Sequence, residues 1–471
     1  MSGFIKNICC IGAGYVGGPT MAVIADKCPH INVYVVDKNK SRIDLWNSIN
    51  FDMLPVYEPG LKEIVRRVRN KNLFFSIDSE KYIKKADAIF ISVNTPVKTS
   101  GLGAGKASNL QWVESCTREI AELAEGHTIV IEKSTLPVKT AEIIKEILDT
   151  NTQVNKKCNK TFSILSNPEF LAEGTAIKDL EFPDRVLIGG DDNNAIEELK
   201  TIYENWVDSK KILTTNLWSS ELSKLAANAF LAQRISSINA ISALCESTGA
   251  DVDEVSKAIG LDNRIGKHFL KSGPGFGGSC FKKDISNLVY LCRSFGLNEV
   301  ADFWEQVIFI NTWQQKRIYE LIVRELFGNV AGKKLVILGF AFKANTNDVR
   351  ESPAIEIVKN FLSEGANLII HDPKVNKDQI AKSLSSNDDF NLSKKLDQKG
   401  TWLFEEDFYE AFRDADAIIT LTEWDFYKKI DWKKVSKIMR CPGWVFDTRS
   451  ILEKDEIKKY GLNYWCVGKG N

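Results

Sequence analysis

The chain has 471 residues, 44% of them hydrophobic, with 62 basic and 62 acidic residues. That length is enough for two or three domains with their own hydrophobic cores. A formal net charge of zero argues against nucleic acid or an anionic membrane surface as a partner. Residues 1–25 lack the pattern of a secretory signal, and no run of about 18 apolar residues predicts a membrane-spanning helix. We therefore expect a cytoplasmic protein.

The cysteines and histidines do not indicate a metal site. The ten cysteines are scattered without a CxxC pair, and the four histidines lack the spacing of metal ligands. In a cytoplasmic protein such cysteines are reduced thiols that mostly fill the core. No metal is expected, and zinc in particular is disfavoured.

Residues 1–215 alternate between strand and helix patterns. A buried strand over 4–11 is followed by glycines, a helix over 19–27 and a second strand over 33–36. The pattern continues with strands at 88–93, 128–134, 161–165 and 185–190 and a helix at 109–125. Such alternation predicts a parallel sheet with helical crossovers. The polar residues 150–160 predict a surface loop.

The pattern changes at residue 216. Residues 219–248 are rich in Ala and Ser, contain no Pro or Gly, and predict one long helix. Its small residues would permit close approach of another helix. We predict a central helical dimerisation domain over 216–330, which contains a cysteine-bearing loop.

Residues 331–471 return to the strand and helix alternation. Strands are predicted at 333–342, 367–373, 415–422 and 444–450, with a helix at 353–364. The polar residues 374–400 predict an insertion. The expected fold is therefore α/β, with two Rossmann-like parallel-sheet domains joined by a long-helix central region.

A glycine motif follows the first predicted strand. It fits GxGxxG and spans Gly12, Ala13, Gly14, Tyr15, Val16 and Gly17. Gly12 would make the tight turn, Gly14 would let a pyrophosphate approach the backbone, and Gly17 would allow close packing. Asp37 ends the second strand, where an acid holds ribose hydroxyls and repels a 2′-phosphate. These residues predict NAD rather than NADP, although Arg42 nearby could meet a phosphate.

Residues 271–284 form a glycine-rich loop around Cys280. The cysteine lies where a helix over 282–294 is predicted to begin, beside lysines, and both features stabilise a thiolate. This is the best position in the chain for a nucleophilic cysteine; the alternative is a structural cysteine in a turn. Asp284, one helical turn later, would face the same way. It could orient a lysine or a water, or simply favour the start of the helix.

Two further features suggest a polar ligand. Lys224 and Asn228 repeat at helical spacing in the long helix, on a face that is otherwise apolar and small. Buried there, they would need polar partners, although a solvated stripe is the alternative. Lys343, after Gly339 and a predicted strand, would lie where a phosphate or ribose binds, which on its own is weak evidence.

These motifs together resemble one family. They read GAGYVGGPT (12–20), ISVNTP (91–96), EKST (132–135), NPEFLAEGTAI (167–177), GFGGSCFKKD (275–284), GFAFK (339–343) and VRESPA (349–354), with a further match over 221–246. On them the chain is identified as similar to the UDP-glucose 6-dehydrogenases of the UDP-glucose/GDP-mannose dehydrogenase family, most of all to the animal enzymes. The resemblance implies NAD-dependent, four-electron oxidation of UDP-glucose to UDP-glucuronate through a thiohemiacetal and a thioester on cysteine.

The resemblance also implies roles for residues. Cys280 would be the nucleophile, Lys224 would stabilise oxyanions and act with Asp284 on protons and water, and Glu169 would serve thioester hydrolysis. Thr135 would hold a water, and Asn228 would sit beside the reacting groups. NAD would contact the glycine motif, Asp37, Arg42, Val93, Asn94, Thr95, Pro96, Val97, Ser134, Thr135, Leu136, Glu173, Cys280, Phe281, Lys282, Lys283 and Arg350. The sugar nucleotide would contact Glu169, Phe170, Leu171, Ala172, Glu173, Lys224, Leu225, Ala226, Ala227, Asn228, Arg264 from a neighbouring subunit, Lys271, Ser272, Gly273, Pro274, Gly275, Phe276, Gly277, Phe342, Lys343 and Arg449.

The resemblance further implies a homodimer as building block of a homohexamer, and allosteric feedback inhibition by UDP-xylose through the loop around Thr135. The alternative substrates are GDP-mannose or a UDP-acetamido sugar; residues 221–246 argue against them. A single-oxidation dehydrogenase of the 6-phosphogluconate type would have no use for Cys280. A sensor without catalysis would be expected to lose Cys280 or Lys224.

Overall fold

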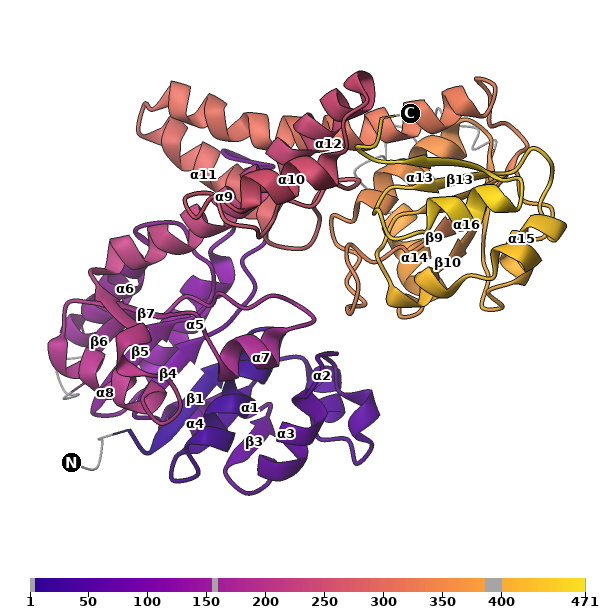
Figure 1. Ribbon diagram of the computed structural model, residues 1–471. Helices are drawn as coiled ribbons and strands as arrows, with labels where there is room; N and C mark the ends of the chain where they lie inside the picture. The colour runs from indigo at the N-terminus through magenta and orange to yellow at the C-terminus, as the bar shows by residue number, and fades with distance from the viewer. Residues whose placement is uncertain (1–4, 155–159, 386–399, 471) are drawn as a thin grey trace. The chain divides into compact units, whose positions relative to one another are not determined.

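The computed structural model describes residues 5–154, 160–385 and 400–470 (Figure 1). The chain forms two compact units, one of residues 1–227 and 286–296 and the other of residues 228–285 and 297–471. Each unit contains one sheet. The predicted domain boundaries at 215/216 and 330/331 stay a prediction.

The sheet of the first unit has eight strands in the order β3-β2-β1-β4-β5-β6-β7-β8. Their bounds are β1 (Asn7–Ile11), β2 (Asn32–Val36), β3 (Leu73–Ser76), β4 (Ala88–Ile91), β5 (His127–Glu132), β6 (Thr161–Ser166), β7 (Val186–Gly190) and β8 (Ile212–Thr215). All neighbours pair in parallel except β6 and β7, which are antiparallel. The predicted parallel-sheet fold is confirmed, with the β6–β7 pair as an antiparallel exception. Between two parallel strands, the chain must return to the edge of the sheet at which the first strand began. After β6 it does not return, and β7 begins at the edge where β6 ends, so the two strands are antiparallel.

Helices cover both faces of this sheet. Along β1, Ile8 and Cys10 belong to one buried cluster and Cys9 and Ile11 to the other. Burial on both faces explains why the inner strands are continuous apolar runs. The helices are α1 (Gly17–Lys27), α2 (Lys40–Trp46), α3 (Leu61–Val68), α4 (Ser79–Ile83), α5 (Gln111–Leu123), α6 (Thr140–Val154), α7 (Ala176–Glu181) and α8 (Asn193–Tyr203).

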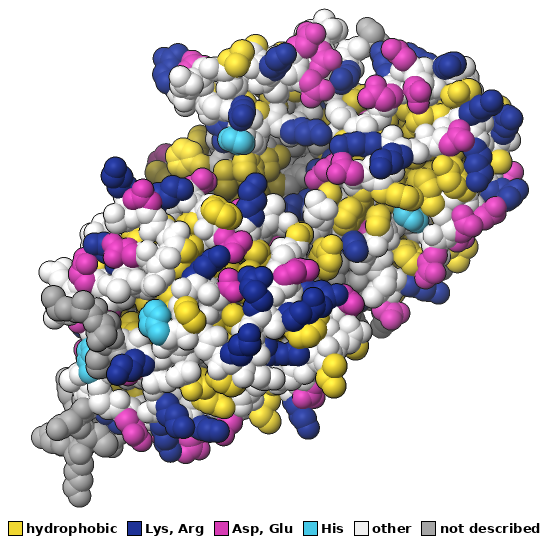
Figure 2. Space-filling model, turned by 60° about the horizontal axis from the view of Figure 1, so that its bottom comes forward, with side chains coloured by type: hydrophobic (Ala, Val, Ile, Leu, Met, Phe, Trp, Pro, Cys, Tyr) yellow, Lys and Arg dark blue, Asp and Glu magenta, His cyan; other side chains and the backbone are white. Residues whose placement is uncertain are grey.

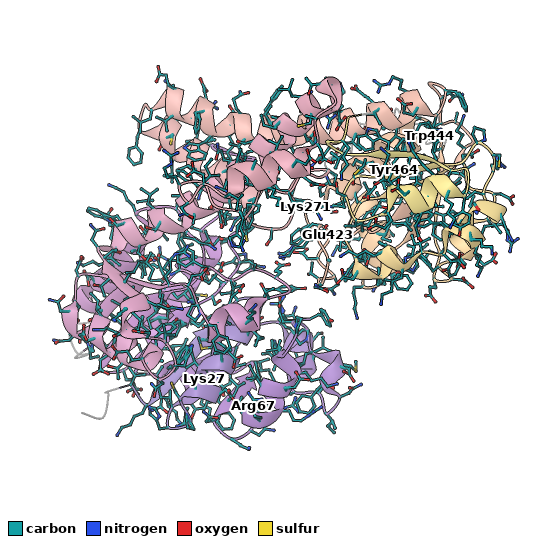
Figure 3. All side chains as sticks on the ribbon, viewed as in Figure 1. Lys27, Arg67, Lys271, Glu423, Trp444 and Tyr464 are labelled. Atoms are coloured by element: carbon teal, nitrogen blue, oxygen red, sulfur yellow. The ribbon has the colours of Figure 1, made fainter. Side chains whose placement is uncertain are left out.

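Ion pairs hold α1 against its neighbours. Lys27 lies 2.7 Å from Glu181 of α7, and Arg67 of α3 donates two hydrogen bonds to Asp26 (Figure 3). The predicted loop at 150–160 is partly wrong, because α6 continues to Val154. Polar composition alone does not distinguish a solvated helical turn from a loop. Residues 155–159 lie outside the described residues.

The second unit combines long helices with a six-stranded parallel sheet. The helices are α9 (Leu217–Thr248), which begins in the first unit, α10 (Val252–Gly260), α11 (Phe281–Ser294), of which residues 286–294 belong to the first unit, α12 (Asn298–Glu325), α13 (Pro353–Ser363), α14 (Lys377–Leu384), α15 (Trp432–Ile438) and α16 (Lys454–Lys459). The strands, in the order β11-β10-β9-β12-β13-β14, are β9 (Lys334–Leu338), β10 (Asn367–His371), β11 (Thr401–Phe404), β12 (Ala417–Thr420), β13 (Trp444–Asp447) and β14 (Asn463–Cys466). The predicted insertion at 374–400 contains α14, and residues 386–399 lie outside the described residues.

The surface agrees with the neutral composition. Figure 2 shows basic and acidic side chains mixed over the face that it draws. Within the described ranges, no helix has the length and apolar character needed to cross a membrane.

Candidate active site

The glycine motif forms a tight turn between β1 and α1. Gly12 has φ +113°, and a Cβ on it would lie 2.3 Å from the carbonyl oxygen of Ser92. A Cβ on Gly17 would lie 2.0 Å from the carbonyl oxygen of Gly12, so α1 packs directly onto the turn. At Gly14, by contrast, nothing lies within 4 Å of an added Cβ. The turn is therefore closed at both ends and open in the middle, where a pyrophosphate could approach the backbone and the start of α1.

Asp37 connects this turn to β2. Its carboxylate accepts the N–H of Ala13 at 3.0 Å and the N–H of Asn39 at 2.8 Å. The Arg42 guanidinium donates to the same carboxylate at 2.9 Å. Arg42 is thus paired with the acid, which reduces its availability for the 2′-phosphate of NADP. The arrangement fits a ribose with free hydroxyls.

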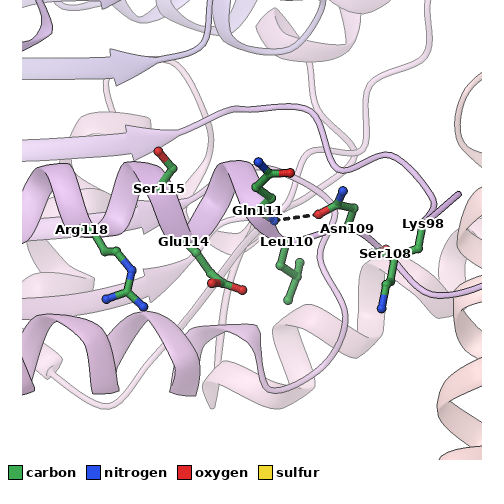
Figure 4. Close-up of a pocket in the computed structure, with 8 residues that line it drawn as sticks. All are labelled: Lys98, Ser108, Asn109, Leu110, Gln111, Glu114, Ser115 and Arg118. Carbon is green, nitrogen blue, oxygen red and sulfur yellow. Dashed lines mark hydrogen bonds between the residues drawn. The ribbon is translucent and has the colours of Figure 1, made fainter. Parts of the chain in front are cut away.

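Two loops continue the site along the sheet edge. The Ser134 hydroxyl donates to the carbonyl of Val93 at 2.7 Å, and the Thr95 hydroxyl donates to the carbonyl of Thr135 at 3.0 Å. These bonds join segments 93–97 and 134–136, which follow β4 and β5. A separate polar hollow lies at the start of α5, where the Gln111 N–H donates to the Asn109 side chain (Figure 4). The hollow adjoins this region, because Asn109 also donates its own N–H to the carbonyl of Pro96.

An ion pair of the first unit lies in the segment after β6. Lys224 on α9 and Glu169 lie 3.2 Å apart, with side chains only 5% and 6% exposed. The second oxygen of Glu169 accepts the N–H of Leu171 at 2.9 Å. The Phe170 ring lies 3.8 Å from the Arg185 guanidinium and 5.4 Å from the Lys224 ammonium. The buried lysine of the predicted polar stripe is therefore paired, as burial requires.

The cysteine loop belongs to the second unit and is held by buried amides. Asn239 of α9 accepts the N–H of Gly273 at 2.9 Å, Gln314 of α12 donates to the Gly273 carbonyl at 2.9 Å, and Asn311 accepts the N–H of Phe276 at 2.8 Å. A Cβ on Gly275, whose φ is +119°, would lie 2.7 Å from Asn311. The loop needs its glycines because it packs against this amide scaffold.

Cys280 ends the loop immediately before α11. It is partly exposed, whereas Cys292, on α11 itself, is buried. The Asp284 N–H donates to the Cys280 carbonyl at 2.8 Å, which is the first turn of the helix. The Asn228 amide donates to the Asp284 carboxylate at 2.6 Å. A helix start, a partly exposed thiol, a buried carboxylate and an amide therefore occur together. This arrangement suits a nucleophile whose protons are transferred by a neighbouring group.

The loop after β9 packs onto the glycine loop. A Cβ on Gly277 would lie 2.9 Å from Phe342, and the Gly278 N–H donates to the Arg350 carbonyl at 2.8 Å. Arg449 donates to the carbonyls of Leu421 at 2.8 Å and Phe342 at 3.1 Å and pairs with Glu423. Figure 3 labels Glu423 together with Lys271, the first residue of the glycine-rich loop.

Three predicted contact residues have other surroundings. Arg264 is highly exposed and paired with Asp262, so its predicted contact with a neighbouring subunit stays a prediction. The Arg350 guanidinium donates to Asp348. Leu225 is fully buried and fills the core. Among the described residues the Ser272 hydroxyl is buried without a hydrogen-bond partner, so a ligand in the glycine loop could use it.

The family is decided by comparison with known proteins. UDP-glucose 6-dehydrogenase 1 of Glycine max is 55% identical over 98% of this chain and 97% of its own length. UDP-glucose 6-dehydrogenase of Gallus gallus is 54% identical over 99% of this chain and 93% of its own. The chain belongs to the UDP-glucose/GDP-mannose dehydrogenase family. The family's NAD-binding, central and UDP-binding domains match residues 6–207, 218–313 and 336–454.

Solved structures agree with this family assignment. A UDP-glucose dehydrogenase from Pyrobaculum islandicum is 28% identical and superimposes with a TM-score of 0.82. The match covers 100% of this chain and 99% of the other. A UDP-D-ManNAc dehydrogenase from Pyrococcus horikoshii, at 24% identity and a TM-score of 0.79, shares the fold. The predicted fold class, NAD as cofactor and membership of this dehydrogenase family are confirmed.

Sequence reasoning missed the amides that hold the cysteine loop. Asn311 and Gln314 lie three residues apart on the buried face of α12, a signal that resembles the Lys224 and Asn228 pattern. Two further residues belong to no sequence motif that would have singled them out. Trp46 donates its indole N–H to the Ala13 carbonyl under the glycine turn, and the Arg185 guanidinium lies over the Phe170 ring.

Proposed function

We propose that the chain is an NAD-dependent UDP-glucose 6-dehydrogenase that produces UDP-glucuronate. The observation that carries the proposal is Cys280, a partly exposed thiol at the start of α11 in a glycine loop held by three buried amides. A dehydrogenase that stops at an aldehyde has no need for it. Its relatives of more than 50% identity, named above, act on UDP-glucose.

The cofactor would be held by the open turn at Gly14, by Asp37 and by the joined segments 93–97 and 134–136. When bound, NAD⁺ accepts a hydride at its nicotinamide. The glycine loop, Phe342, Lys343 and Arg449 would hold the nucleotide part of the substrate, with the Ser272 hydroxyl available as a further donor. The Lys343 ammonium lies on the same loop as Phe342, 5.5 Å from its ring.

The reaction needs these residues to act at one carbon atom, C6 of glucose. Loss of a hydride and a proton converts the alcohol to an aldehyde. The Cys280 sulfur then adds to the carbonyl, and the oxygen takes up a proton, which gives a thiohemiacetal. Loss of a second hydride and a proton gives a thioester. Water attacks the thioester carbon, the C–S bond breaks, and the acid and the free thiol are released.

Charged residues would support each step. Lys224 would stabilise negative charge on the substrate oxygen. Asp284, kept in place by Asn228, would exchange protons near the thiol. Glu169, which lies 3.2 Å from the Lys224 ammonium, would activate the water for hydrolysis. Thr135 would help to hold that water.

Substrate choice tests the proposal. NADH formation should be fast with UDP-glucose and at least about 100-fold slower with GDP-mannose or a UDP-acetamido sugar, because a bulky or differently hydrogen-bonded group must fit the same pocket. A higher kcat/KM for GDP-mannose or for a UDP-acetamido sugar than for UDP-glucose would contradict the proposal. It would favour a dehydrogenase of that other nucleotide sugar.

Asp37→Ser should weaken NAD⁺ binding and narrow the preference over NADP⁺. The change removes the acceptor for ribose hydroxyls, releases Arg42, and takes away the charge that repels a 2′-phosphate. Isothermal titration calorimetry measures the affinity for both cofactors. Asp44→Ser, on the neighbouring helix α2, is the control and should bind both cofactors as the wild type does. Unchanged NAD⁺ affinity would show that Asp37 does not bind the ribose.

We also propose self-association, through a dimer built on the helices of the second unit and a hexamer assembled from dimers. Phe230 and Leu244 on α9 and Phe303 and Phe309 on α12 are each 57% to 60% exposed. Phe230 and Phe303 both lie against the Trp304 ring. Exposed apolar groups that gather in this way indicate a protein contact, whereas single ones do not. The double variant Phe230→Ser, Phe309→Ser should shift light scattering toward monomer, whereas Phe182→Ser should not. A wild-type chain that is active and wholly monomeric would contradict assembly.

A further inference from the structure

Two buried carboxyl groups in the first unit lie outside the groups assigned above. Glu132 ends β5 and Glu221 lies on α9; they are 2% and 3% exposed, and their carboxyl groups lie within hydrogen-bonding reach of each other. Two carboxyl groups in such contact cannot both ionise in a buried site. The pair therefore shares one proton at neutral pH.

The backbone shows which group carries that proton. Both oxygens of Glu221 accept N–H groups, from Lys139 at 2.8 Å and from Ala141 at 2.9 Å. N–H donors favour an ionised acceptor, so Glu221 is the carboxylate and Glu132 the acid that donates to it. Burial, followed by the proximity of Glu221, raises the pKa of Glu132 well above its usual value, and burial also raises the pKa of Glu221.

Glu221 holds the end of the loop that carries Thr135. Lys139 has φ +81°, a left-handed conformation that is uncommon for a residue with a side chain. Such a conformation persists only where the surroundings support it, and Glu221 supplies that support by accepting the N–H groups on either side of Thr140. The beginning of the loop is joined to Val93 and Thr95 as described above.

The neighbouring lysines have other partners. Lys133 donates to Asn167 at 3.0 Å and to Tyr203 at 3.2 Å, Lys139 lies 4.0 Å from Glu142, and Lys224 pairs with Glu169. On the flanking strands, Glu132 pairs with Ile91 of β4 and Ser166 of β6, which carry no charge. The shared proton therefore limits the negative charge of the two carboxyl groups to one.

We propose that Glu221 is a positioning residue for the loop around Thr135, and that its hold depends on the proton shared with Glu132. The loop is anchored while the pair carries one proton and is released when that proton is lost. The inference rests on the proposed function only for its catalytic consequence, since the anchor itself is a property of the fold.

The direction of the pH effect follows from the raised pKa of Glu132. The proton is present at neutral pH, and the anchor is lost as the pH rises through that raised pKa, when two carboxylates repel each other. At low pH a second proton on Glu221 weakens its bonds to the N–H groups. The anchor is therefore strongest between the two titrations of the pair.

Hydrogen exchange of the full-length chain tests the anchor without reference to catalysis. The protection factor of the peptide containing Lys139–Ala141 should fall at least about tenfold from neutral to alkaline pH, since one pH unit beyond a pKa changes the protonated fraction about tenfold. Glu132→Gln keeps a neutral donor at every pH and should keep this protection. Glu221→Gln should lose it at every pH, and Glu142→Gln, a matched change in the first turn of α6, should behave as wild type.

Kinetics then test the consequence for the site. In the wild type, kcat should fall and the KM for NAD⁺ should rise at alkaline pH. Glu132→Gln should have the wild-type kcat and KM at neutral pH, and both changes should occur at a higher pH in this variant. Wild-type protection that does not change with pH, or that falls equally in Glu132→Gln, would overturn the proposal. The wild-type series decides the matter even if the variant fails to fold. A chain that does not oxidise UDP-glucose would contradict the proposed function and leave the exchange result standing.

Discussion

Cys280→Ala should abolish formation of UDP-glucuronate, with turnover to the acid reduced by about 10³-fold or more, in line with the loss of other covalent nucleophiles. Without the thiol no thiohemiacetal forms, so the aldehyde cannot be held for a second hydride loss and no thioester exists to hydrolyse. Product analysis by chromatography measures the loss of acid, and mass spectrometry of the intact protein should find no sugar adduct.

Cys292→Ala is the matched control for this variant. Cys292 lies on α11, the helix that follows Cys280, but it is buried, and burial raises the pKa of its thiol. It should retain wild-type turnover. Wild-type acid formation in Cys280→Ala, or an adduct mapped to another cysteine, would contradict the covalent mechanism. The assignment of the dinucleotide-binding turn would be unaffected by that outcome, because it depends on residues 12–37 alone.

Glu169→Gln should leave both oxidations possible and slow the release of the acid by about 10²–10⁴-fold, the usual contribution of a general base. A rapid-mixing experiment should show a burst approaching two NADH per site, followed by near arrest. The protein should then carry a sugar nucleotide on Cys280, detected by intact mass. A steady state without a burst would show that Glu169 acts before hydrolysis or not at all.

The ion pair of Glu169 with Lys224 requires a stability control. Both side chains are buried, and removal of one partner leaves a buried charge, which typically costs about 3–5 kcal/mol. Glu169→Gln should therefore lower the melting temperature as well. Lys224→Met, Glu169→Gln, which removes both charges, should recover much of this stability but not the hydrolysis. Recovery of hydrolysis would assign the defect of the single variant to misfolding.

The sequence predicted the inner strands of both sheets and missed the four outer ones. β3, β8, β11 and β14 are edge strands of four residues each, and at least two residues of each are partly or fully exposed. An inner strand of such a sheet is buried on both faces and forms a continuous apolar run, whereas an edge strand does not. The periodicity on which the prediction relied is therefore weakest at the edges.

The candidate site was predictable where backbone geometry demands a particular residue. Gly12 and Gly17 are required by close contacts, and Asp37 by its position at the end of β2. The supports of the site were not predictable in the same way. Glu221 contacts a loop about 80 residues earlier in the chain, and Asn239 holds a glycine 34 residues later. Such contacts depend on tertiary packing, which a local pattern does not encode.

The number of NADH formed per UDP-glucose consumed tests the central claim most directly. Absorbance gives the NADH, and chromatography gives the substrate lost and the acid formed in the same sample. Oxidation of one carbon through a thioester on Cys280 predicts two NADH for each UDP-glucose, with UDP-glucuronate as the product. One NADH for each UDP-glucose, with the aldehyde as the end product, would contradict the account.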